Sequence, residues 1–127
     1  YRLYDLKKSV QLIVTYPTYN LVDLNLSQDE RSALVEFYSE HSPANHQDKT
    51  VVIAKWLKDV KGIDEVNKDI VFTVLRTLGE STSFNISQAL VNAKNLKSFF
   101  VSTEAGKFKI NHIGEDHVDR DLVGKDK

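Results

Sequence analysis

The sequence predicts a mostly helical α+β fold, and three observations support that prediction. Several segments repeat apolar residues at the three- and four-residue spacing of an amphipathic helix. Serine, asparagine and glycine stand where those helices would begin and end. Near the end of the chain, two short alternating segments flank a turn with glycine, which is typical of a β-hairpin.

The amino-acid composition limits the classes of protein to which this chain can belong. The chain has 127 residues, 41% hydrophobic and 28% charged, which is ordinary for a globular domain. It has no cysteine, so disulfides, thiolate zinc sites and cysteine nucleophiles are excluded. No apolar run approaches the roughly 18 residues of a membrane span, and no signal-peptide pattern is seen, so we expect no membrane partner and a cytoplasmic location. The chain also has no methionine, and we expect it to be cut from a longer protein.

Residues 1–26 allow two interpretations. Apolar residues recur at helical spacing from Leu3 to Ile13, whereas the β-branched content of residues 9–16 also suits a strand. We favour a helix that ends before Pro17, followed by an extended connector to residue 26.

A clear helix is predicted from Ser27 to Pro43. Ser27 with Glu30 three residues later has the pattern of a capping box, in which each side chain bonds to the backbone N–H of the other residue. Leu34 and Phe37 belong to the apolar stripe, and Pro43 stops the helix.

The next helix is predicted over residues 49–60, with Asp48 or Thr50 as its cap and Gly62 at its end. Its apolar face comprises Val52, Ile53, Trp56, Leu57 and Val60. These residues lie at the spacing that brings side chains together on one side of a helix, so we expect them in the core.

A third helix follows after a four-residue link. Asn67 caps it, and Gly79 stands where a left-handed residue would end it. Its core face comprises Ile70, Val71, Val74, Leu75 and Leu78. We expect Trp56, Ile70, Val74, Leu75, Leu90 and Phe100 to be buried together.

A fourth helix is predicted over residues 85–97, capped by Ser83 or Asn85. On a wheel of about 3.6 residues per turn, its inner side comprises Ile86, Ala89, Leu90, Ala93 and Leu96. Its outer side is polar but uncharged, with Lys94 on the flank, and comprises Ser87, Gln88, Val91, Asn92 and Asn95. Residues 99–101 should then pair antiparallel with residues 108–110 across Glu104-Ala105-Gly106.

From residue 49 to residue 114, this order of elements resembles the winged helix-turn-helix superfamily. The matching segments are TVVIAKWL, NKDIVFTVLRTLG, NISQALVNAKNL and the hairpin FFVSTEAGKFKINHIG. The resemblance implies a two-stranded wing and a third helix that enters the major groove of DNA, although many such proteins bind other proteins instead. It divides the chain into an N-terminal helical extension (1–47), a winged-helix domain (48–114) and an acidic, flexible tail (115–127).

The candidate binding residues lie in the predicted fourth helix and the hairpin. Residues 81–111 hold four lysines and one acid, although the whole chain has a net charge of −1. Gln88, Asn92 and Asn95 are the candidates for base edges, because amides pair with adenine. The candidates for phosphate contacts are Lys94, Lys97, Lys107 and Lys109. The absence of arginine between Arg76 and Arg120 counts against DNA binding, because the guanidinium group of arginine is the one best suited to form paired hydrogen bonds with guanine and phosphate.

The sequence therefore predicts a binding module without catalytic residues, metal site or cofactor. The leading function is duplex DNA binding, as in transcription regulation. The alternative is a protein–protein interaction or assembly domain of a larger bacterial protein that uses the uncharged face of the helix at 85–97. Homo-oligomer formation is left open. The four histidines occur in pairs five positions apart, which does not suit a helical metal site, and we expect them on the surface.

Overall fold

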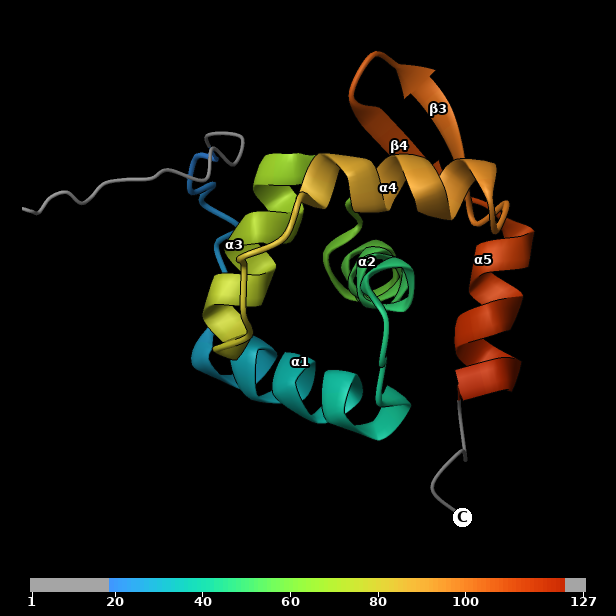
Figure 1. Cartoon of the computed structure of the whole chain (residues 1–127). Helices are drawn as coiled ribbons and strands as arrows, with labels where there is room; N and C mark the ends of the chain where they lie inside the picture. The colour runs from blue at the N-terminus through green and yellow to red at the C-terminus, as the bar shows by residue number, and fades with distance from the viewer. Residues whose placement is uncertain (1–18, 123–127) are drawn as a thin grey trace, which may run out of the picture.

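The computed structural model describes residues 19–122, which form an α+β structure that is mostly helical. The helix α2 lies at the centre, seen end-on in Figure 1, and four other helices pack around it. The helices are α1 (Gln28–His41), α2 (His46–Trp56), α3 (Lys68–Leu78), α4 (Ile86–Asn95) and α5 (His112–Asp116).

The central position of α2 follows from its composition. Seven of its eleven residues are buried, and five of them are consecutive, at positions 50–54. A helix that is apolar on all sides must be covered on all sides. Asn45 caps this helix by accepting a hydrogen bond from the Asp48 backbone N–H, so the predicted cap at Asp48 or Thr50 is wrong and the helix begins earlier.

Beyond Trp56 the chain continues as a π-helical turn, η1 (Leu57–Lys61), and ends at Gly62, whose φ of 69° is left-handed. The wider turn changes the register of the side chains. As a result Val60, which was predicted in the core, is 47% exposed.

The capping box of α1 is confirmed. The Ser27 hydroxyl accepts from the Glu30 N–H, and the Glu30 carboxylate accepts from the Ser27 N–H. The helix ends at Ser42, directly before Pro43, and buries Leu34 against α2 and α3.

The predicted caps of α3 are also confirmed, with Asn67 at its start and Gly79 at its end. Before it lies a strand that was not predicted, β2 (Glu65–Val66). Two residues are too few to show the alternation by which a strand is recognised.

The predicted hairpin is confirmed. Strand β3 (Phe100–Glu104) pairs antiparallel with β4 (Lys107–Ile110), with Phe100 opposite Ile110. Gly106, with a φ of 80°, supplies the left-handed residue of the turn. Strand β2 pairs with the other side of β4, so the sheet order is β2-β4-β3.

The inner face of α4 is buried as predicted at Ile86, Ala89, Leu90 and Ala93. Leu96 is the exception, because the helix ends at Asn95 and the chain turns at Ser98, and this side chain is 72% exposed. The predicted core is confirmed for Trp56, Val74, Leu75, Leu90 and Phe100, and Ile70 packs partly buried against it.

Residues 19–27 run extended along α3, as the predicted connector requires. The Asn20 N–H donates to Asp69 Oδ1 at 3.0 Å near the start of α3, and the Val22 N–H donates to Thr73 Oγ1 at 2.9 Å one turn later. The Tyr19 hydroxyl accepts from the Ile86 N–H at 3.0 Å, and so caps α4 from a distance. The helix predicted before Pro17 lies outside the described residues.

The expected flexible tail from residue 115 is wrong as far as residue 122. There α5 is capped by Asn111 and continues as a π-helical turn, η2 (His117–Leu122). Val118 and Leu122 lie four positions apart, so they share one face, and both are buried.

Candidate nucleic-acid interface

Helix α4 and the β3–β4 hairpin lie on the same side of the molecule, away from α1 (Figure 1). Because the inner face of α4 packs on α2, its outer face is turned to solvent. The structure therefore brings most of the predicted binding residues to one region, although they come from two elements separated in sequence.

The amides of α4 do not act as three separate groups. Gln88 and Asn92 are one helical turn apart, and the Gln88 Nε2 donates to Asn92 Oδ1 at 2.9 Å. Asn95 instead accepts from Lys94 Nζ at 3.3 Å. Gln88 and Asn95 are exposed and Asn92 is half-buried.

The Gln88–Asn92 pair presents a defined pattern to solvent. Their mutual bond uses one amide N–H and one carbonyl oxygen, so an NH2 group and a carbonyl oxygen remain side by side. Exchanging the oxygen and nitrogen positions of both amides leaves the same two groups. A donor beside an acceptor is the pattern that complements the N7 and N6 positions of adenine in the major groove.

The lysines differ in their surroundings. Lys107 Nζ lies 3.2 Å from Glu104 Oε1, and both side chains are well exposed, at 45% and 66%. Such a surface ion pair is worth little, so a phosphate could replace the carboxylate. Lys97 and Lys109 are exposed and form no ion pair with any residue between 19 and 122.

The acids around these lysines reduce the positive field. Glu104 lies at the hairpin tip, and Glu65 of β2 is the direct cross-strand neighbour of Lys109. Asp69 stands in the first turn of α3, close to α4. The four lysines therefore do not form the uninterrupted basic surface that strong phosphate binding favours.

A groove separates α4 from the hairpin, and no sequence pattern indicated it. Its volume is about 350 Å³. We call it the α4–hairpin groove; it is lined by Asn67, Lys68, Asp69, Ser87, Leu90, Val91, Gly106 and Phe108. Three elements far apart in sequence build it, so the only local signal was Val91, an apolar residue on an otherwise polar face.

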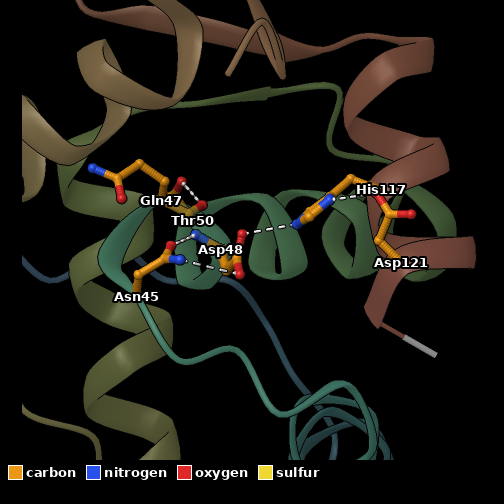
Figure 2. A network of polar contacts seen from close by, with 6 residues as sticks. All are labelled: Asn45, Gln47, Asp48, Thr50, His117 and Asp121. Atoms are coloured by element: carbon orange, nitrogen blue, oxygen red, sulfur yellow. Dashed lines mark hydrogen bonds and ion pairs between the residues drawn. The ribbon is translucent and has the colours of Figure 1, made fainter. Parts of the chain in front are cut away.

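A second polar cluster lies at the start of α2, on another part of the molecule (Figure 2). His117 Nε2 is 2.8 Å from Asp48 Oδ1, and its Nδ1 is 2.9 Å from Asp121 Oδ2. The imidazole also stacks on Phe99, with ring centroids 4.6 Å apart. Asn45, which caps α2, donates to the other Asp48 oxygen at 3.4 Å. This cluster joins the C-terminal helix to α2, and we assign it a structural role.

The expectation of four surface histidines is wrong for two of them. His41 is only 6% exposed and lies with Nδ1 2.8 Å from the Phe37 carbonyl oxygen, while His117 is partly buried in the cluster above. His46 stacks on Phe84 with centroids 3.8 Å apart, and burial followed by the nearby Lys49 lowers its pKa. Within residues 19–122, no three histidine, aspartate or glutamate side chains are arranged to hold a metal ion.

The arrangement defines a mostly helical α+β protein with a three-stranded antiparallel sheet. In the part of the chain that the structure describes, no helix is long and apolar enough to cross a membrane. No known protein family, curated protein or solved structure matches this chain.

Proposed function

We propose that this chain is a non-catalytic, winged helix-turn-helix module that binds duplex DNA. The observation that carries the proposal is the order of its elements: α2, β2, α3, α4, β3 and β4, with the sheet order β2-β4-β3. This order resembles that of winged helix-turn-helix proteins, including the short strand between the first two helices. In such proteins the third helix enters the major groove, and α4 is the third helix in this order.

The size and chemistry of α4 support this role. Ten residues at about 1.5 Å each give a helix about 15 Å long, and a major groove about 12 Å wide admits one helix. In this pose the Gln88–Asn92 pair faces base edges, with its NH2 group on adenine N7 and its carbonyl oxygen on N6. Asn95 and Lys94 lie further along the same helix.

The hairpin would follow the DNA backbone as a wing. Lys107 and Lys109 alternate with the buried Phe108 on β4, so both project from the same face of the sheet. Lys97 follows the end of α4 and would reach the DNA backbone on the opposite side of the major groove. Each phosphate that a lysine neutralises releases counterions, and this release supplies most of the affinity.

Electrophoretic titrations at two salt concentrations test the proposal. Lys107→Ala with Lys109→Ala should weaken binding equally for all sequences and reduce the salt slope by about 2. Asn92→Ala should instead relax sequence preference, by about 1–3 kcal/mol at one base position. Arg31→Ala, which removes one positive charge on the remote α1, is the control and should change neither quantity.

The absence of any shift at micromolar protein in low salt would refute DNA binding, because non-specific electrostatic binding alone is detectable there. One observation favours a protein partner instead, namely that Leu90, Val91 and Phe108 line a groove beside the uncharged face of α4, because interface cores are depleted of charge. For that alternative, Val91→Glu is the informative substitution, since it places a carboxylate on the groove wall.

A further inference from the structure

The α4–hairpin groove is lined partly by apolar side chains, with Lys68 and Asp69 also in its lining. Among the apolar lining residues, Leu90 and Phe108 are buried and Val91 is half-buried. About 350 Å³ lies within the range of pockets that hold ligands, about 300–1,000 Å³, and so it accommodates several side chains.

The start of the described chain lies close to this groove. The segment runs along α3 from its first turn, where the Asn20 N–H bonds to Asp69, towards its last turn near Thr77. Asp69 lines the groove. Tyr19 bonds to the N–H of Ile86, the residue before the lining residue Ser87. Residues 19 and 20 therefore lie beside residues that line the groove or adjoin its lining.

The sequence directly before Tyr19 has the chemistry that the groove requires. Residues 10–16, VQLIVTY, form the longest apolar cluster of the chain and carry no charge. In an extended chain Val10, Leu12, Val14 and Tyr16 share one face, because side chains alternate. At about 3.3–3.6 Å per residue, Tyr16 lies within about 10 Å of Tyr19, and Val10 within about 30 Å. That reach covers α4, which is about 15 Å long.

We propose that residues 10–16 of this same chain occupy the α4–hairpin groove. Bound there, the segment covers Val91 and lies beside the Gln88–Asn92 pair, so it competes with any macromolecule that docks on α4. The docking itself is independent of the proposed function, whereas the competition with DNA rests on it.

A spin label tests the docking in the intact chain. Because the chain has no cysteine, Ile13→Cys provides a single labelling position, on the face of the extended segment that points away from the groove. With the label in place, the amide signals of Val91, Gly106 and Phe108 should lose intensity. A label at Val35→Cys on α1, which is exposed on the opposite side of α2, is the matched control and should leave them unchanged.

Unchanged signals at Val91, Gly106 and Phe108 with the Ile13→Cys label would overturn the proposal. A second sample mixes spin-labelled, isotopically unlabelled chains with label-free, isotopically enriched chains. Loss of intensity there would show that another copy supplies the segment, and would also overturn docking within one chain. Loss that is confined to the singly labelled chain supports it.

The effect on DNA is measured separately. Leu12→Glu places a charge among the apolar residues of the segment and should release it from the groove. The dissociation constant for DNA should then fall by a factor equal to the reciprocal of the undocked fraction in the wild type. That factor is about tenfold if nine-tenths of the wild-type molecules are docked. Leu3→Glu adds the same charge outside the segment and should not. A positive spin-label result without any DNA shift would leave the docking standing and refute the DNA function, whereas unchanged affinity in Leu12→Glu would overturn the competition.

Discussion

Gly114 lies where the C-terminal helix packs closely against the rest of the molecule. A Cβ at this position would lie 2.6 Å from the Phe99 carbonyl oxygen, 2.8 Å from Ile110 Cγ1 and 3.1 Å from Val51 Cγ2. The nearest of these atoms belongs to the backbone, so it cannot move aside as the end of a side chain does. Gly114→Ala therefore tests how tightly α5 packs.

The sign of the effect distinguishes this packing from simple helix propensity. Alanine in an exposed helix is favoured over glycine by about 1 kcal/mol. Here the new methyl group must displace the Phe99 carbonyl, which accepts a hydrogen bond of 3.0 Å from the Asn111 N–H. Weakening that bond costs about 0.5–1.5 kcal/mol and overpacking about 1–3 kcal/mol. We expect a net loss of about 1–3 kcal/mol in the free energy of unfolding.

Urea-induced unfolding of the two proteins measures this difference as a shift of the midpoint at constant slope. Asp116→Ala, an exposed position in the same helix, is the control and should change stability by no more than about 0.5 kcal/mol. A Gly114→Ala protein as stable as the wild type, or more stable, would refute the close packing of α5 on Phe99.

The remaining predictions concern the core, the histidines and pH. Leu90→Ala should destabilise by about 2–5 kcal/mol, since it opens a cavity under the groove; a loss below about 0.5 kcal/mol in urea would contradict its burial. His117→Ala removes the imidazole that bonds to the buried carboxylate of Asp48, and should lower the melting temperature more than His112→Ala at an exposed position does. Burial, and then Lys49, lowers the pKa of His46 below its usual 6.5. The unfolded chain therefore binds a proton at His46 more readily than the folded protein does, and the free energy of unfolding should fall as the pH drops through about 6.5. His46→Gln should flatten the dependence of that free energy on pH between about pH 5 and 7. An unchanged dependence would contradict the reasoning.

The parts of the fold that the sequence predicted correctly depend on neighbouring residues. The capping box at Ser27 is three residues long, and the turn at Gly106 joins two strands that pair with each other. The inner face of α4 follows from helical spacing alone, except at Leu96, where the end of the helix decides exposure.

What the sequence did not reveal depends on contacts between distant elements. Five acids in residues 112–127 suggested a solvated tail, whereas Val118 and Leu122 are buried and hold the helix on the core. The α4–hairpin groove needs three elements in place before it exists. The pairing of Gln88 with Asn92 could have been foreseen from their four-residue spacing, but its effect on the pattern of donors and acceptors needed the side-chain geometry.

The long-range cap that Tyr19 provides on α4 also bears on how the chain folds during synthesis. Sixty-seven positions separate this tyrosine from the Ile86 N–H that it caps. At about 5–20 residues per second, a ribosome takes about 3–13 s to add the intervening chain. When α2 is complete, only α1 of the helices that cover it has been made, so its other apolar sides are available to chaperones until α3, α4 and α5 follow. Tyr19, although made early, thus reaches its final position only after α4 has been made.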